Sequence, residues 1–437
     1  MSFEFRDHNS CRYPGVAVNC LTCCVDALKP YATSLPPLLG TQKMARIEIT
    51  SLKCYFFLFF LSVGSALGWV TCVSLTLPLL LLSYAVPISS IHQKYRFITR
   101  FIAQSLGRLI IFFITSVYGT TITTSGDTLS NIDATTLRKQ PVLLLCNHRT
   151  KVDLLFLLCL FNHSKLLSYL TIQLQSKLSS LPFLGWMCQF FQYMFVDLND
   201  TTKWETADRT NILESMACQT GDAPTYLLFC EGTSLSPTTL QAANLYSATH
   251  NLMPRKYVLH PQTNSTELVL EQLRTAHPET LMVYDLTIAY KDHEQGVPTS
   301  AKSFTSGTMP NNVHVDVEKI LLSNIPTTDD VDDQSFNTWL ANRWDLKEKV
   351  LALHYEANEE KEQPFYNKQR VVSKRCFPKL NVLVNFILIV LFGIVYISRV
   401  RFFIWTVFLG IQLIINRCCG GVHLLERCIR SRRKKFL

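Results

Sequence analysis

The fold is anchored by a segment in which an apolar run, a polar turn and a second apolar run follow one another: Val142-Leu143-Leu144-Leu145-Cys146-Asn147-His148-Arg149-Thr150-Lys151-Val152-Asp153-Leu154-Leu155-Phe156-Leu157-Leu158. Val142–Cys146 has the length and composition of a short buried strand, and Val152–Leu158 is typical of the start of an apolar helix. Asn147–Lys151 is then the strand-to-helix turn. Open α/β sheets bind their ligands at such turns, beyond the carboxyl ends of the strands.

Two residues of this turn region, His148 and Asp153, form a candidate dyad. On a regular helix, residues five apart lie about 140° from each other around the axis. A strand-to-helix turn avoids this problem, because Asp153 in the first helical turn can fold back towards His148. An imidazole held by a carboxylate can take a proton from a hydroxyl group and make an alcohol nucleophilic. A chance pairing among the 11 histidines of the chain is the alternative.

A second polar turn, Phe229-Cys230-Glu231-Gly232-Thr233, follows the apolar run Tyr226–Phe229. A glycine lets backbone amides approach a ligand closely, and a threonine hydroxyl can donate a hydrogen bond to a phosphate. Glu231 fits a phosphate site only if it accepts hydrogen bonds from its neighbours. Taken alone, Glu-Gly-Thr favours an ordinary turn at the end of a strand.

Together the two turns resemble the glycerophospholipid acyltransferases, which transfer an acyl chain from acyl-CoA to a lysophospholipid. Further segments are similar to the branch that contains lysocardiolipin, lysophosphatidylinositol and lysophosphatidic acid acyltransferases: Leu181–Trp186, Tyr257–Pro261, Tyr284–Tyr290 and Trp339–Tyr355. The resemblance extends from Pro141 to Tyr355, and the blocks occur in the family's order.

The resemblance implies a role for each residue of the two turns. His148 would be the general base that acts on the free glycerol hydroxyl of the acceptor, and Asp153 would orient its imidazole. The expected substrate-binding residues are Asn147, Arg149, Glu231, Gly232 and Thr233, with the last three around the glycerol phosphate. Acyl-CoA is the implied co-substrate, and neither a cofactor nor a metal is implied.

Two positions depart from the family pattern. Leu198 follows Met194–Asp197 where the second block usually ends in an arginine, so Lys203 or Arg209 would have to reach back. Gln262 follows His260-Pro261 where the branch tends to have another arginine. Neutral side chains lose the bidentate grip of arginine on phosphate. The alternative is therefore a catalytically silent lipid-binding membrane protein on the same fold.

A serine hydrolase is a third interpretation, and the sequence disfavours it. The chain contains no Gly-x-Ser-x-Gly turn, and Thr305-Ser306-Gly307 is a poor substitute for one.

The 15 cysteines of the chain show no disulfide-like spacing, and Cys20–Cys24 has no partner pair at zinc-finger distance. Free thiols in a reducing compartment are the simpler expectation.

Long uncharged runs explain why 48% of the residues are hydrophobic. A membrane helix needs about 20 apolar residues. Cys54–Ile91 therefore predicts a membrane helical hairpin with a break near Gly64–Gly68 or at Pro78, or one span plus an interfacial piece. Residues 380–416 predict a C-terminal membrane helix pair. Lys94–Arg108 predicts a basic amphipathic connector on the membrane surface.

The net charge of +9 suits an enzyme that works on anionic lipid and a polyanionic thioester. Nucleic-acid binding is disfavoured, because the cationic residues cluster beside the apolar runs. Lys434-Lys435-Phe436-Leu437 resembles a cytosolic retrieval signal of endoplasmic reticulum membrane proteins. Basic residues on both sides of the last apolar pair also place its ends in the cytosol. We expect a multi-pass membrane protein of the endoplasmic reticulum with a cytosolic catalytic domain.

The expected fold class is α/β, a largely parallel sheet flanked by helices, with N-terminal and C-terminal membrane helices. Four apolar strands alternate with helical stretches: Val142–Cys146, Tyr193–Val196, Tyr226–Phe229 and Met282–Ala289. Gly296–Asn312 predicts a loop, and Phe336–Ala357 a charged, solvated helix. The expected division is a poorly ordered arm (1–53), a membrane hairpin (54–91), an acyltransferase α/β domain (92–360), a basic linker (361–379), a membrane helix pair (380–416) and a basic cytosolic tail (417–437).

Overall fold

The computed structural model describes residues 41–85, 89–127, 129, 140–196, 212–213, 216, 224–250, 252–290, 309–326, 335–356, 370–371 and 403–427. The chain forms two units, Met1–Ile49 and Thr50–Leu437, and all contacts given below lie within the second unit. Residues 1–40, the apolar run 380–398 and the dilysine end lie outside the described residues. The predictions made for those segments therefore stay predictions.

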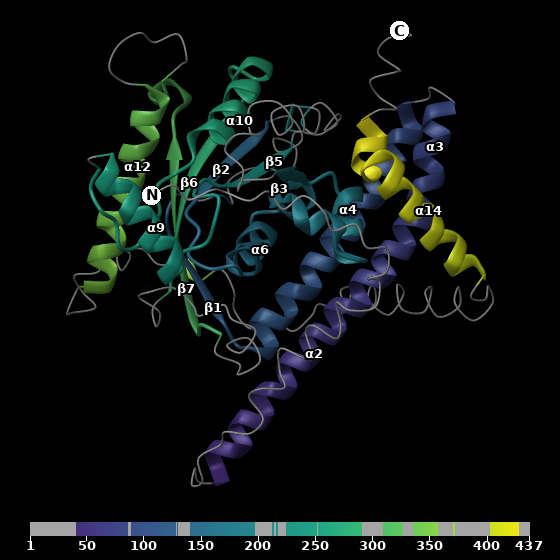
Figure 1. Ribbon diagram of the computed structural model, residues 1–437, viewed down its shortest axis with the longest axis horizontal. Helices are drawn as coiled ribbons and strands as arrows, with labels where there is room; N and C mark the ends of the chain where they lie inside the picture. Colours follow the sequence, from purple (N-terminus) through teal and green to yellow (C-terminus); the bar gives the residue numbers. More distant parts are fainter. Residues whose placement is uncertain are drawn as a thin grey trace, which may run out of the picture. The chain divides into compact units, whose positions relative to one another are not determined.

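A single eight-stranded sheet has the order β4-β3-β5-β2-β6-β7-β1-β8 (Figure 1). Five of the seven strand pairings are parallel, and β6–β7 and β1–β8 are antiparallel. The predicted class, a largely parallel sheet flanked by helices, is confirmed. The strands are β1 Thr121–Gly126, β2 Val142–Cys146, β3 Leu170–Gln175, β4 Met194–Val196, β5 Thr225–Phe229, β6 Met282–Tyr290, β7 Asn312–Ile320 and β8 Arg370–Val371.

The helices that complete this domain cover both faces of the sheet (Figure 1). The α-helices are α6 Asp153–His163, α7 Leu184–Phe190, α9 Pro237–Thr249, α10 Thr263–Ala276 and α12 Phe336–Glu356. Short 3-10 segments are η5 Leu167–Tyr169, η6 Ser176–Ser180 and η8 Leu322–Asn324. Helix α6 packs on one face and α10 and α12 on the other.

Strand β2 is buried at every position because both of its faces are covered. Side chains alternate along a strand. Leu144 accordingly packs in the core beneath α6, and Leu143 and Leu145 pack in the core beneath α10 and α12. The apolar run that predicts this strand therefore belongs to the centre of the sheet.

The register of β2 aligns the two polar turns. Cys146, the last residue of β2, is opposite Phe229, the last residue of β5. The Cys230 amide donates to the Cys146 carbonyl at 3.3 Å. Because both strands are parallel, the turns that follow them emerge at the same edge of the sheet.

The N-terminal region forms helix α2 Thr41–Thr71, a π-helical segment Cys72–Thr76 and helix α3 Leu77–Ala85. The expected break near Gly64–Gly68 or at Pro78 is wrong, because helix continues through all three. A Cβ on Gly64 would lie 3.2 Å from Leu109, and one on Gly68 would lie 2.7 Å from the Met187 sulfur, so these glycines permit close packing. The π turn, in which the Leu77 amide bonds to the Cys72 carbonyl, accommodates the missing N–H of Pro78.

The expected surface connector, Lys94–Arg108, lies inside helix α4 (Ser89–Phe112), which continues into the π-helical segment Phe113–Val117. Tyr95, Thr99 and Ile102 are buried within the protein. The amphipathic pattern had indicated an apolar face without specifying whether protein or lipid covers it. Two helices, Phe57–Ser83 and Ser90–Val117, are long and apolar enough to cross a membrane.

The C-terminal segment includes helix α14, Phe403–Cys419. Gln412 accepts a hydrogen bond from the Trp69 indole at 3.2 Å, and Glu426 accepts hydrogen bonds from Tyr95 at 2.8 Å and Gln192 at 2.6 Å. The predicted basic tail therefore begins too early, because Glu426 and the residues around it are buried in the fold. Within the predicted linker, β8 pairs with β1 as a sheet strand.

Candidate active site

The turn after β2 brings His148 and Asp153 into contact. The His148 Nδ1 lies 2.9 Å from the Asp153 Oδ2. Asp153 is the first residue of α6, and its carboxylate accepts the Thr150 amide at 3.0 and 3.1 Å and also the hydroxyl of Tyr290. Asp153 is completely buried, whereas 18% of the His148 side chain is exposed. The carboxylate is thus fixed, and the imidazole remains accessible.

The contact with Asp153 determines which ring nitrogen of His148 is free to react. An ionised carboxylate only accepts hydrogen bonds, so Nδ1 carries the proton. In a neutral ring, Nε2 is then a hydrogen-bond acceptor. The ring also stacks on Phe229, with centroids 4.4 Å apart and planes 29° apart. The arrangement can therefore accept a proton at Nε2 from a bound hydroxyl.

Asn147 and Arg149 hold the turn from inside the protein. The Asn147 amide exchanges two hydrogen bonds with the backbone of Ile288, at 3.2 and 2.8 Å. The Arg149 guanidinium donates to the Tyr257 carbonyl at 2.8 Å and lies over the Tyr355 ring, 4.9 Å from its centroid. Both side chains are buried. We therefore revise their expected role from substrate contact to positioning of the turn.

Glu231 is also directed into the protein. Its carboxylate is buried and accepts the indole N–H of Trp344 at 3.0 Å. Burial is the main cause that raises the pKa of Glu231 from 4.5 to about 7. The hydrogen bond from Trp344, the charge interaction with His148 and the backbone amides of Leu259 and His148 oppose this rise. The carboxylate therefore accepts hydrogen bonds from backbone amides around His148, and the repulsion expected between Glu231 and a phosphate is avoided.

Gly232 and Thr233 form the outer part of the second turn. Gly232 has a φ of 71°, and a Cβ there would lie 2.7 Å from the side-chain amide of Gln262. Thr233 is exposed. The Leu235 amide donates to the His148 carbonyl at 2.9 Å, so the two turns are joined. Gln262 covers Gly232, and the other departure, Leu198, lies outside the described residues with Lys203 and Arg209.

Sequence reasoning missed three residues that support the dyad: Tyr290, Trp344 and Tyr355. All three occur in segments that resemble the acyltransferase family, but nothing in their spacing indicates contact with the turns.

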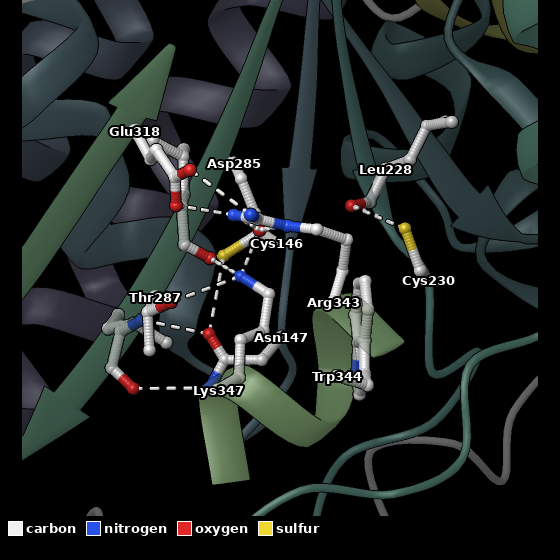
Figure 2. Close-up of polar contacts among 12 residues, drawn as sticks. Cys146, Asn147, Leu228, Cys230, Asp285, Thr287, Glu318, Arg343, Trp344 and Lys347 are labelled. Carbon is white, nitrogen blue, oxygen red and sulfur yellow. Dashed lines mark hydrogen bonds and ion pairs between the residues drawn. The ribbon is translucent and has the colours of Figure 1, made fainter. Parts of the chain in front are cut away.

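The expectation that helix α12 is solvated is wrong, since Trp344 and Lys347 are buried. In Figure 2, Trp344 and Lys347 lie on the side of α12 that faces the sheet. Among the described residues, no group of three or more His, Cys, Asp or Glu side chains is arranged to hold a metal ion.

The segment that contains both turns matches a known protein family in sequence. Residues 126–291 match the family model described as Acyltransferase. Residues 126–291 therefore form an acyltransferase domain, similar in sequence to lysocardiolipin and 1-acyl-sn-glycerol-3-phosphate acyltransferases. This acyltransferase domain contains both polar turns, the dyad and Tyr290, whereas α12 lies beyond its matched end.

Three curated relatives extend the match beyond that domain. Lysocardiolipin acyltransferase 1 of Gallus gallus is 27% identical over 401 residues, which cover 89% of this chain and 97% of the relative. A probable 1-acyl-sn-glycerol-3-phosphate acyltransferase 5 of Arabidopsis thaliana is 29% identical over 53% of this chain and 59% of its own length. Lysophosphatidylinositol acyltransferase 10 of Caenorhabditis elegans is 27% identical over 54% of this chain and 56% of its own length.

Proposed function

We propose that this protein is a membrane-bound acyltransferase that moves an acyl chain from acyl-CoA to the free hydroxyl of a lysophospholipid. The observation that carries the proposal is the His148–Asp153 pair, 2.9 Å apart within the acyltransferase domain. The buried carboxylate and the partly exposed imidazole meet the requirements of a general base.

In the proposed reaction, His148 Nε2 accepts the proton of the acceptor hydroxyl. The hydroxyl oxygen attacks the thioester carbonyl carbon, and the carbonyl π electrons move to its oxygen. Collapse of this tetrahedral intermediate breaks the carbon–sulfur bond, and the thiolate of CoA takes the proton from the imidazolium. Asp153 stabilises the imidazolium between these steps. An ester forms, a thioester breaks, and no acyl-enzyme is required.

The donor and the acceptor class are supported by different observations. Acyl-CoA as the donor is supported by the resemblance of both turns to a family that uses it. The relatives are named for lysocardiolipin, 1-acylglycerol-3-phosphate and lysophosphatidylinositol, which all carry a glycerol hydroxyl next to a phosphate. Gly232 and Thr233, at the surface of the second turn, remain our candidates for contact with that phosphate.

A membrane location follows from the chemistry of the acceptor, which resides in a bilayer. The apolar helices Phe57–Ser83 and Ser90–Val117 support membrane attachment. The cluster of arginines and lysines between residues 427 and 435 supports a cytosolic position for that segment. We therefore propose a multi-pass endoplasmic reticulum enzyme whose active site faces the cytosol.

Membranes containing the protein should be assayed with labelled acyl-CoA and a competing mixture of lysophospholipids. The proposal predicts acyl transfer by the unmodified protein and its loss in His148→Ala. His163→Ala is the matched control, because His163 is an exposed histidine at the far end of α6. If the unmodified protein transfers no acyl chain to any acceptor, the silent lipid-binding alternative replaces this proposal.

A further inference from the structure

Helix α12 lies outside the segment that matches the acyltransferase family, yet it contacts residues that hold each member of the dyad. Trp344 bonds to Glu231, and the hydroxyl of Tyr355 accepts the backbone amide of Tyr290 at 3.0 Å. A helix that only covers the sheet would bury apolar side chains without these directed polar contacts. The pattern indicates a role in the site itself.

Buried charges fix the position of α12 on the sheet. Asp285 of β6 accepts two hydrogen bonds from Arg343, at 2.7 and 3.0 Å, and forms an ion pair with Lys347 at 2.5 Å. Arg343 also bonds to Glu318 of β7, and Lys347 donates to the Leu286 carbonyl at 2.6 Å (Figure 2). Buried charges are costly when a partner is lost. The helix therefore cannot rotate or slide without breaking these pairs.

Trp344 lies between Arg343 and Lys347, so the ion pairs that fix helix α12 also fix the position of its indole ring. Its indole N–H can only donate, so the direction of the 3.0 Å hydrogen bond to Glu231 is certain. The same carboxylate interacts with the backbone amides of His148 and Leu259. Trp344 thereby fixes the Glu231 carboxylate, and this carboxylate accepts the backbone amide of His148.

A second series of contacts runs from α12 to Asp153. The Tyr355 hydroxyl accepts the Tyr290 amide, and the Tyr290 hydroxyl donates to Asp153. The Tyr355 ring also lies beneath the Arg149 guanidinium. Trp344 and Tyr355 are three turns of helix apart, and each leads to a different member of the dyad.

We propose that α12 is a positioning element of the active site, in which Trp344 positions His148 through Glu231 and Tyr355 positions Asp153 through Tyr290. The inference rests on the proposed function, because its main effect is measured on acyl transfer. Neither Trp344 nor Tyr355 contacts substrate in this account. Both are positioning residues.

The kinetic test compares Trp344→Phe with Trp339→Phe, a matched change on the same helix away from Glu231. We expect Trp344→Phe to lower kcat at least tenfold while KM for both substrates stays within twofold. The ionised Glu231 carboxylate is the form that accepts the His148 amide, so protonation of Glu231 should weaken the positioning of His148. The Trp344 hydrogen bond lowers the pKa of Glu231, and its loss should therefore move the acidic limb of the pH–rate profile to higher pH. Trp339→Phe should change neither. Tyr355→Phe tests the second series in the same assay, and remains available if Trp344→Phe does not fold.

An infrared titration provides a readout that does not depend on activity. The carboxyl band of Glu231, identified by its loss in Glu231→Gln, should titrate near pH 7 in the unmodified protein and at higher pH in Trp344→Phe. Unchanged kcat and an unchanged band in Trp344→Phe would overturn the inference, as would a fall in kcat without a shift of the band. If the unmodified protein is inactive, the proposed function fails, and the band still decides whether Trp344 acts on Glu231.

Discussion

Tyr290, the last residue of β6, donates its hydroxyl to the carboxylate of Asp153, far from it in sequence. Asp153 is therefore held by its own turn through the Thr150 amide and by a separate strand through Tyr290. Each oxygen of the carboxylate has a defined role, because Oδ2 contacts His148 and Oδ1 contacts Tyr290. The strand order, with β6 next to β2, makes this contact possible.

Removal of the Tyr290 hydroxyl should weaken catalysis without unfolding the protein. A hydrogen bond to a charged group contributes about 1.5–3 kcal/mol. We therefore expect Tyr290→Phe to lower kcat by roughly 10- to 100-fold, with little change in KM. Steady-state kinetics at saturating acyl-CoA would measure this. Tyr284→Phe, on the same strand, is the control and should retain full activity. Equal kinetics for the two variants would show that the Tyr290 contact is dispensable.

The protonation of Glu231 should make stability depend on pH. Burial raises its pKa from 4.5 to about 7, so the folded protein binds more protons than the unfolded chain between these values. Stability should therefore fall as pH rises from about 4.5 to 7, by on the order of 3 kcal/mol from this group. Glu231→Gln cannot titrate and should lose that part of the slope. Denaturant unfolding at several pH values tests this, and identical slopes for the two proteins would contradict it.

The turn at Gly232 should reject any side chain for two separable reasons. Ala at a positive φ costs about 1–2 kcal/mol, and its Cβ would also collide with Gln262. Gly119 provides the control, because it has a similar φ of 75° and open space around it. We expect Gly232→Ala to destabilise the protein more than Gly119→Ala. Adding Gln262→Ala to each glycine variant should remove that difference. Thermal unfolding of the two glycine variants, of Gln262→Ala and of the two double variants measures both contributions. Equal losses for the two glycines would show that Gln262 exerts no steric effect.

The C-terminal segment should depend on Glu426 for its attachment to the N-terminal helices. Glu426→Ala removes the acceptor of both Tyr95 and Gln192 and leaves buried polar groups without it. Such losses cost about 1–3 kcal/mol for each group. We expect earlier thermal unfolding in detergent and faster proteolysis within residues 403–427. Glu279→Ala, at an exposed position, should behave like the unmodified protein. Unchanged proteolysis of Glu426→Ala would exclude this anchoring role.

Sequence patterns predicted the centre of the sheet well because its strands are buried on both faces. Val142–Cys146 is a strand with the predicted bounds, and Met282–Ala289 differs from β6 by one residue. Strands β1 and β7 were missed because they mix polar and apolar side chains. His314 of β7, for example, is buried between Thr123 and Ser125 of β1, at 2.8 Å from each. Pairing between strands so distant in sequence leaves no local signal.

The dyad was predicted correctly as a contact because both residues belong to one local turn. The buried orientation of Glu231 could not be predicted, since it depends on Trp344 from a distant helix. Asn147 and Arg149 similarly bond to Ile288 and Tyr257, whose proximity arises only in the folded sheet. Short-range spacing thus identified the reactive group, and long-range packing determined its supports.

Chemical rescue tests the role of His148 most directly. His148→Gly should lose acyl transfer by about 10²–10⁴-fold, the usual contribution of a general base. Added imidazole should restore part of the transfer, in proportion to its neutral form, because it can accept the hydroxyl proton in the vacated space. Transfer by His148→Gly at the unmodified rate without imidazole would contradict the account.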